Sequence, residues 1–223
     1  MRINQKSELA FYERAFKHHK DRRERRYGSW EYTPSKSVAE IVRKNKLNVG
    51  SKDKRELDAG CGDGRHIQFF RSLGFSVVGV DFTANSIKVC QARFSRDKSV
   101  RLKRIDLTQR RALKALGMFD VANDWSVLDH IRGKYFKAYV KNISDAVRPG
   151  GFLILSEFDR SIPGLYKGRN YKIIKGHYFR AFSVDELLKI FKDFILVDKK
   201  ERVLEDKINK YRFNTVLLKK PEK

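Results

Sequence analysis

Residues 56–64 of this 223-residue chain read ELDAGCGDG, and this stretch decides the fold. A strand candidate, Arg55–Ala59, runs directly into three glycines at alternating positions, and a helix candidate, Arg65–Ser72, follows them. Glycines at such a turn let the backbone approach a ligand closely, and the N-terminus of the next helix adds polar backbone groups. The stretch therefore predicts a strand–turn–helix unit that binds a small molecule.

The spacing of these glycines distinguishes two classes of ligand. A dinucleotide-binding turn has the pattern G-x-G-x-x-G, whereas this turn reads G-x-G-x-G and has Arg65 in place of the third glycine of that pattern. The carboxylate of Asp58 precedes the glycines, and it repels a pyrophosphate because like charges repel. An acid at this point suits a ligand that carries an amino group and a sulfonium.

Strands and helices alternate along the rest of the chain. This alternation predicts an α/β fold, a doubly wound parallel sheet with helices on both faces. The further strand candidates are Ser76–Asp81, Val100–Ile105, Phe119–Ala122, Gly151–Phe158, Phe194–Val203 and Tyr211–Leu218. The further helix candidates are Thr83–Arg96, Gln109–Leu116, Lys134–Val147 and a helix that a capping-box pattern starts at Ser183.

The first fifty residues differ from this alternating pattern. Helices are predicted from about Ser7 to Arg26 and from Thr33 to about Lys46, so residues 1–50 are expected to form a helical arm or cap on a domain at residues 51–223. An aromatic loop joins the two helices. Its candidate substrate-binding residues are Tyr27, Trp30 and Tyr32.

Two further acids stand where predicted strands end. Asp81 closes the second strand and can accept hydrogen bonds from two ribose hydroxyls. Asp106 follows the third strand and can accept one from an adenine amine. Because adjacent parallel strands end at the same edge of a sheet, these acids and Asp58 are expected to line one crevice. The alternative is that Asp81 and Asp106 only cap helices.

These features, with FDVAND at 119–124 and RPGGF at 148–152, resemble the successive motifs of the class I S-adenosylmethionine-dependent methyltransferases. The resemblance runs from about residue 55 to residue 158. It implies a Rossmann-like sheet of seven mostly parallel strands whose last strand is antiparallel, an enzyme, and S-adenosylmethionine as the cofactor. The cofactor-binding residues that it implies are Asp58, Gly60 and Gly62 at the methionine end, Asp81 at the ribose, Asp106 and the Leu107 amide at the adenine, and Asn123 on the methionine side through its backbone. Cys61 and Phe82 are further cofactor-binding candidates.

The candidate catalytic residues, Trp125 and His130, follow the fourth strand, where the family faces the reactive methyl group. Trp125 can stack on a planar acceptor or wall the sulfonium by a cation–π contact, and the alternative is a core tryptophan. His130 can serve as a general base near neutral pH, and the alternative is a structural histidine. The sequence contains no metal-ligand cluster, and no metal is expected.

Positive charge dominates the composition, since 50 Lys and Arg stand against 27 Asp and Glu and leave a net charge of +23. Such a field attracts polyanions, which makes RNA a candidate partner, unless the surface is only Lys-rich and solvated. The segment Arg160–Arg180 contains cations and tyrosines but no acid, which is typical of single-strand binding. Within it Tyr178 and Arg180 are candidate substrate-binding residues. HYFRAFS at 177–183 and RFNTV at 212–216 also resemble the tRNA wobble-uridine methyltransferases.

Three functions therefore stay open. The expected function is methyl transfer to an acceptor, with RNA as a candidate. The alternatives are a small-molecule methyltransferase with an incidentally basic surface, and a non-catalytic scaffold of the same fold that binds RNA or protein. The absence of a long apolar run or a signal peptide predicts a cytoplasmic protein without a membrane span. The acceptor atom and the oligomeric state do not follow from the sequence.

Overall fold

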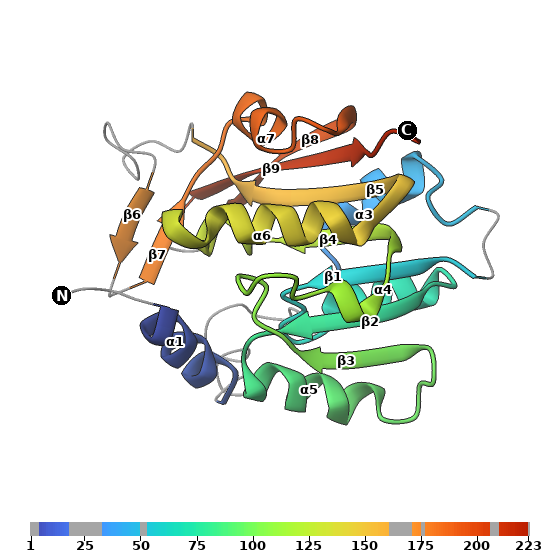
Figure 1. Cartoon of the computed structure of the whole chain (residues 1–223), viewed down its shortest axis with the longest axis horizontal. Coiled ribbons are helices and arrows are strands. Elements are labelled where there is room, and N and C mark those ends of the chain that lie inside the picture. Colours follow the sequence, from blue (N-terminus) through green and yellow to red (C-terminus); the bar gives the residue numbers. More distant parts are fainter. Residues whose placement is uncertain are drawn as a thin grey trace.

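A seven-stranded sheet in the order β3-β2-β1-β4-β5-β9-β8 forms the centre of the molecule (Figure 1). The computed structural model describes residues 5–17, 33–49, 53–160, 171–174, 177–205 and 210–222. The strands are β1 (Arg55–Ala59), β2 (Ser76–Asp81), β3 (Val100–Arg104), β4 (Phe119–Trp125), β5 (Val147–Phe158), β8 (Ile195–Glu205) and β9 (Lys210–Lys219). Strands β1 to β5 pair in parallel, while β9 is antiparallel to both β5 and β8. The predicted doubly wound sheet with an antiparallel last strand is confirmed.

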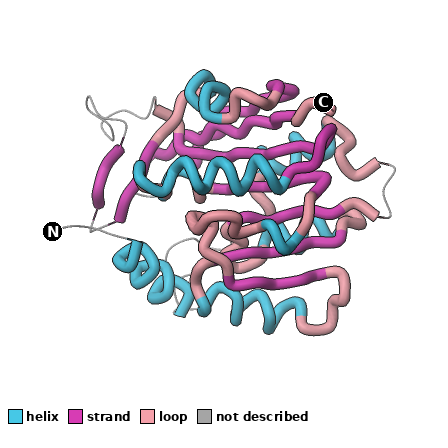
Figure 2. The backbone as a smooth tube through the Cα atoms, in the orientation of Figure 1, coloured by secondary structure: helices cyan, strands magenta, loops and turns pink. Residues whose placement is uncertain are grey.

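Helices cover both faces of this sheet (Figure 2). One buried apolar cluster joins it to α3 (Lys36–Lys44), α4 (Arg65–Ser72) and α5 (Ala84–Phe94). The other joins it to α6 (Gly133–Ala146) and α7 (Val184–Ile190). Among the described residues no helix has the length and apolar character needed to cross a membrane.

A second structural layer lies at the carboxyl ends of the parallel strands. The helix α1 (Gln5–Lys17) and a two-stranded sheet of β6 (Tyr171–Ile174) and β7 (His177–Arg180) sit at this end of the molecule (Figure 1). The predicted continuation of α1 to Arg26 and the aromatic loop with Tyr27, Trp30 and Tyr32 lie outside the described residues. The division of the chain at residue 50 stays a prediction.

Local sequence explains several element boundaries. Ser183 begins α7 with the predicted capping box, in which its hydroxyl accepts from the Glu186 amide and the Glu186 carboxylate accepts from the Ser183 amide. Gly79 in β2 lets α4 pack closely, because a β-carbon there would lie 2.6 Å from the Ile67 side chain. Such close packing of helix on strand holds the glycine turn at residues 60–64 in place.

The predicted helix Gln109–Leu116 is wrong. The segment forms turns and a short 3-10 helix, η1 (Lys114–Leu116), and Arg111 adopts a left-handed φ of 57°. The cause lies in α6, where the Asn142 amide donates to the carbonyl oxygens of Leu107 (2.8 Å) and Gln109 (2.7 Å). These side-chain bonds hold the segment in turns, and its helix propensity is overridden by the tertiary contact.

Two strand boundaries also differ from the sequence-based ones. β4 continues three residues beyond Ala122 to Trp125, and β5 begins at Val147 rather than Gly151. The register between these strands shifts between Phe119 and Val121, so an irregular start of β5 pairs with β4. Turn residues such as Pro149 and Gly150 concealed this start, because they are disfavoured inside a regular strand.

One buried acid in the sheet has no visible function. The side chain of Glu56 in β1 is completely buried, and neither carboxylate oxygen has a hydrogen-bond partner among the described residues. Burial, with a smaller contribution from Asp58, raises the pKa of Glu56 well above its usual value. Burial therefore favours the neutral acid, and folding takes up a proton at pH values between the unfolded and the folded pKa of Glu56.

We expect Glu56→Met to raise the free energy of unfolding at pH 7 by about 1–3 kcal/mol, since a buried unpaired polar group is removed. The wild-type acid costs nothing in proton uptake below its unfolded pKa near 4.5. Its cost grows by about 1.4 kcal/mol per pH unit above that value, until the folded pKa is reached. Urea denaturation at pH 4.5 and 7 tests this, with the exposed Glu222→Met as control. If the stability gained by Glu56→Met does not grow with pH, Glu56 does not have a raised pKa in the folded protein.

Candidate functional site

The ends of β1 and β4 hold a buried polar pair. Asp58 and Asn123 lie opposite each other in the sheet, and the Asn123 amide donates to Oδ1 of Asp58 at 3.1 Å. Oδ2 of Asp58 and the amide oxygen of Asn123 have no hydrogen-bond partner among the described residues. Burial raises the pKa of Asp58 to about 7. One carboxylate oxygen and one amide oxygen without partners suit a ligand with an amino group.

The glycine turn is fastened to the neighbouring strand by its backbone. The amides of Gly60 and Cys61 both donate to the carbonyl oxygen of Val80, at 2.8 and 2.9 Å. Gly60 has a φ of 70°, and a β-carbon there would collide with the side chain of Val127. Only glycine allows this conformation and this close approach.

Asp81 links the glycine turn to the next helix. Its Oδ1 accepts from the amide and the hydroxyl of Thr83, both at 2.9 Å, and its Oδ2 accepts from the Gly62 amide at 3.1 Å. Burial raises the pKa of Asp81, and these hydrogen bonds oppose the rise. Each carboxylate oxygen has two lone pairs, so Oδ2 in particular keeps capacity for a ribose hydroxyl. A local capping role and a ligand-binding role are compatible here.

Both carboxylate oxygens of Asp106 accept hydrogen bonds from residues shortly after it in the chain. Its Oδ1 accepts from the Thr108 amide (2.9 Å) and hydroxyl (2.6 Å), and its Oδ2 accepts from the Gln109 side chain at 2.9 Å. No helix begins directly after Asp106, so these hydrogen bonds stabilise a turn rather than cap a helix. The side chain stays partly exposed at the end of β3, next to the buried Leu107.

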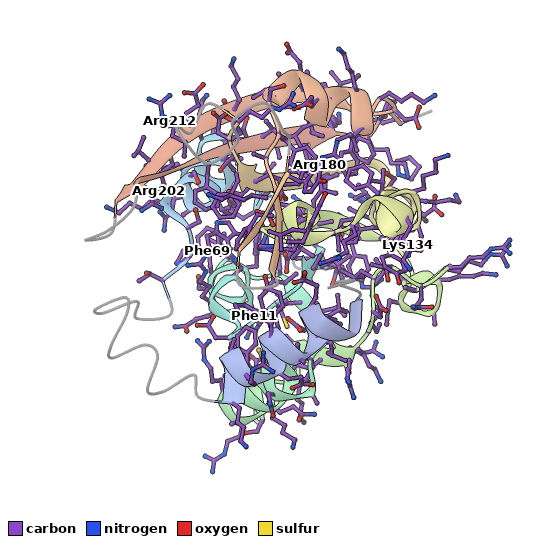
Figure 3. The ribbon with its side chains drawn as sticks, turned by 90° about the vertical axis from the view of Figure 1, so that its left-hand side faces the viewer. Phe11, Phe69, Lys134, Arg180, Arg202 and Arg212 are labelled. Carbon is purple, nitrogen blue, oxygen red and sulfur yellow. The ribbon has the colours of Figure 1, made fainter. Side chains whose placement is uncertain are left out.

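The helix α1 spans the carboxyl ends of the strands and is anchored on both sides. Figure 3 views the molecule from this end, with α1 in front and Phe11 labelled on it. The Glu13 carboxylate accepts from the amides of Ala84 (2.7 Å) and Asn85 (3.0 Å) at the start of α5. At the other side, Glu8 accepts from Arg132 and from the Tyr178 amide, each at 3.0 Å.

Two aromatic residues of α1 face the site, and sequence analysis missed both. The Phe16 ring packs against Gly62, 3.3 Å from where a β-carbon on Gly62 would stand. The Tyr12 ring lies 5.9 Å from that of Phe82 and 5.7 Å from that of His130. Burial raises the pKa of Tyr12, and the carboxylates of Asp129, Glu8 and Asp81 add to this rise. The apolar residues of this helix are visible in the sequence, but the surface on which they pack is not.

His130 is held between two protein oxygens in the short helix η2 (Leu128–His130). Its Nδ1 lies 2.8 Å from the carbonyl oxygen of Tyr178, which can only accept, so Nδ1 carries a proton. In the neutral ring Nε2 is then an acceptor. Nε2 lies 3.1 Å from Oδ1 of Asp129 but outside hydrogen-bond geometry. The arrangement makes Nε2 the nitrogen that could take a proton from a ligand.

Three buried carboxyl groups support the loop that carries His130. Asp124 accepts from the Tyr139 hydroxyl at 2.7 Å, Asp129 accepts from the Ser126 hydroxyl at 2.7 Å, and Glu157 accepts from the Asp129 amide at 2.9 Å. Burial raises the pKa of Asp124 to about 6 and those of Asp129 and Glu157 further above their usual values. Glu157 lies in β5, so no local sequence pattern connects it to the other two.

Trp125 lies among core side chains. Its ring is stacked on that of Phe213 at 5.8 Å, and the Arg65 guanidinium lies 3.7 Å from its centre. It packs against the apolar cluster of α3 and α4. These contacts are those of the core-tryptophan alternative, and a direct role of Trp125 in catalysis stays a prediction.

The side chains of the two substrate candidates on β7 lie on the face of the strand away from His130, although the Tyr178 carbonyl oxygen contacts that ring. Tyr178 and Arg180 share one face of this strand, where Arg180 is 4.8 Å from the Phe136 ring and Arg132 is 5.4 Å from the Tyr178 ring. The residue between them, Phe179, faces the other way and lies 4.9 Å from the His130 ring. Their role in substrate binding stays a prediction, and Phe179 is the β7 residue that reaches the site.

We expect Glu13→Ala to loosen α1, because it removes the carboxylate that caps α5. A lost cap costs about 0.5–2 kcal/mol, or roughly a 2- to 30-fold faster amide exchange in α1. Hydrogen–deuterium exchange of residues 5–17 measures this, and Arg14→Ala, an exposed neighbour, is the matched control. Equal exchange in both variants would show that the Glu13 contact does not hold the helix.

Comparison with known proteins agrees with this geometry. A family profile described as a methyltransferase domain matches residues 57–153. An uncharacterised methyltransferase of Schizosaccharomyces pombe is 27% identical over 124 residues, which cover 55% of this chain and 84% of that protein. A ubiquinone biosynthesis O-methyltransferase of Idiomarina loihiensis is 34% identical over 114 residues, 49% of this chain and 44% of the relative, so this match spans less than half of either protein.

The fold also matches solved structures. The 1,6-didemethyltoxoflavin-N1-methyltransferase of Burkholderia thailandensis, with bound 1,6-didemethyltoxoflavin and S-adenosylhomocysteine, superimposes with a TM-score of 0.70. The match covers 96% of this chain and 88% of that one at 18% identity, which establishes the fold. With the glycine turn and the strand-end acids, the profile match identifies residues 57–153 as a methyltransferase domain, and the fold of the chain is that of the class I S-adenosylmethionine-dependent methyltransferases.

Proposed function

We propose that this methyltransferase acts on a small planar acceptor at an oxygen or nitrogen atom. The observation that carries the proposal is the aromatic enclosure around His130. Rings of Tyr12, Phe158 and Phe179 lie 5.7, 6.4 and 4.9 Å from its imidazole. Small-molecule sites are lined mainly by apolar and aromatic groups with a few polar ones. The ubiquinone and toxoflavin relatives, named for small ring-containing compounds, support this choice.

The cofactor is proposed to lie along the ends of β1, β2 and β3. Asp58 and Asn123 fit the methionine amino group, since each has an oxygen without a partner among the described residues. Asp81 fits the ribose through Oδ2, and the ring of Phe82 flanks it. Asp106 with the Leu107 amide is the proposed adenine contact, and Gly60, Cys61 and Gly62 form the wall beside the methionine.

Methyl transfer requires little chemistry from the side chains of the protein. Bound S-adenosylmethionine supplies an already activated methyl group, so the protein mainly positions the acceptor and excludes water. α1 closes over the strand ends and suits the exclusion of water. His130 is the proposed base for an acceptor hydroxyl, which would replace Asp129 beside Nε2. Burial raises the pKa of Asp129, which disfavours an anion beside Nε2.

RNA is the second candidate acceptor, and the charge distribution favours it. The net charge is +23, and α1 and β6, at the strand ends, carry the exposed cations Arg14, Lys17 and Lys172 (Figure 1). Such cations track a phosphate backbone. The aromatic enclosure could then receive an unstacked base. A non-catalytic scaffold is the third candidate, and the intact strand-end acids count against it.

We expect Asp81→Ala to weaken S-adenosylmethionine binding, because a charge-assisted hydrogen bond contributes about 1.5–3 kcal/mol, or roughly a 10- to 100-fold change in Kd. Titration calorimetry measures it. Thr83→Ala is the matched control, since it removes the hydroxyl that bonds Asp81 but keeps the carboxylate. Thermal unfolding checks that both variants fold. Unchanged affinity in Asp81→Ala would remove Asp81 from the proposed site.

Acceptor class is decided by transfer of a labelled methyl group. Incubation with labelled S-adenosylmethionine and separate pools of RNA, protein and small metabolites should place the label in the metabolite pool. Label in RNA, lost when Arg14, Lys17 and Lys172 are together changed to Glu, would overturn the small-molecule proposal in favour of the second candidate. Cofactor binding without label in any pool would support the scaffold. His130→Ala should lower transfer by about 10²–10⁴-fold if it is the base.

A further inference from the structure

The two edges of the central sheet present different chemistry to a second copy of the chain. β3 forms one edge and β8 the other (Figure 1). Exposed cations occupy β3 at Arg101, Lys103 and Arg104. Two such strands side by side repel each other, because like charges directly opposite destabilise a strand pair. β8 carries both signs of charge with apolar residues on either side, so only this edge can pair favourably with itself.

We propose that two copies of the chain associate through antiparallel pairing of their β8 strands, centred on Lys200. The strand reads ILVDKKERVLE from Ile195 to Glu205. In this register Lys199 lies opposite Glu201 of the second copy, and Asp198 lies opposite Arg202. Val197 then lies opposite Val203. The exposed Lys199 and Glu201 thus meet opposite charges and Val197 meets an apolar residue, while Ile195 lies opposite Glu205. The two sheets become continuous.

Exposure of apolar residues on β8 supports this partner. Val197 and Val203 are 44% and 41% exposed, and Ile195 is 60% exposed. A shallow pocket of about 500 Å³ lies at the start of β8, lined by Leu188, Phe194 and Leu196 with charged residues around it. Among the described residues no strand pairs with β8 on its outer side. Apolar side chains beside unpaired backbone groups are a template for another strand.

Charges on the opposite face of β8 are already balanced within one copy. Lys200 is paired with Glu40 at 2.9 Å, and Asp198 accepts from Lys44 and Asn45, each at 2.9 Å. Lys200 lies on the twofold axis and is therefore opposite Lys200 of the second copy. Each of these two lysines is paired with Glu40 of its own copy, which reduces their repulsion. The register between the two β8 strands is therefore set by the exposed Lys199 of one copy opposite the exposed Glu201 of the other.

The opposing possibility is an edge that is protected against pairing. The register of β8 on β9 shifts between Leu196 and Asp198, which marks a bulge. Bulges and lysines are common devices that keep edge strands apart. A monomer is the outcome that this possibility predicts.

Sedimentation velocity of the full chain and of charge-reversed β8 variants distinguishes the β8-paired dimer from a monomer. The wild type should dimerise. Lys199→Glu and Glu201→Lys should each weaken the dimer about tenfold, since each turns two attractive pairs into repulsive ones. The double variant K199E/E201K should restore it, because the pairs re-form with exchanged partners.

Matched controls exclude a general effect of net charge. Lys199→Glu lowers the positive charge of each copy and reduces overall repulsion, yet it is expected to weaken the dimer. Lys141→Glu makes the same change of charge on α6, at an exposed residue away from β8, and should leave the dimer intact. All of these positions are on the surface, so thermal unfolding should be unchanged.

Three results would overturn the proposal. One is a wild type that stays monomeric up to its solubility limit. Another is a dimer that tolerates both single reversals, which would place the interface elsewhere. The last is a double variant that stays as weak as the single ones, which would exclude this register.

Discussion

The paired amides of Gly60 and Cys61, both donating to the Val80 carbonyl oxygen, are the constraint on which the site depends. They fasten the glycine turn to β2, and the turn in turn receives Asp81 through the Gly62 amide. A left-handed backbone at all three glycines makes this geometry possible. Without it β1 and β2 would still pair, but their ends would not form a common ligand surface.

The helix α1 covers part of this surface. Its two buried or half-buried glutamates contact different parts of the domain, Glu13 the start of α5 and Glu8 the β7 backbone. A carboxylate at a helix N-terminus is favoured by the helix dipole, so the contact of Glu13 with α5 has an electrostatic cause. Because Tyr12 lies between these anchors, the position of one aromatic ring depends on both ends of α1.

Three buried carboxyl groups beside the site fix the loop that follows β4. Asp124, Asp129 and Glu157 have raised pKa values and still accept hydrogen bonds from neighbouring groups. Such a network costs stability and gives a defined position to the loop before α6. His130 follows Asp129 directly, so the network fixes the position of its ring, whose Nε2 lies 3.1 Å from Oδ1 of Asp129.

Sequence by itself determined the fold class, the turn and the acids at the strand ends, because these follow from short-range pattern and from the rule that parallel strands end at one edge. It did not place Tyr12, Phe179 or Glu157, which reach the site from α1, β7 and β5. It also assigned a helix to residues 109–116, where two hydrogen bonds from Asn142 hold turns. These features depend on contacts between residues far apart in the chain, and only the packed tertiary structure decides which of these distant side chains meet.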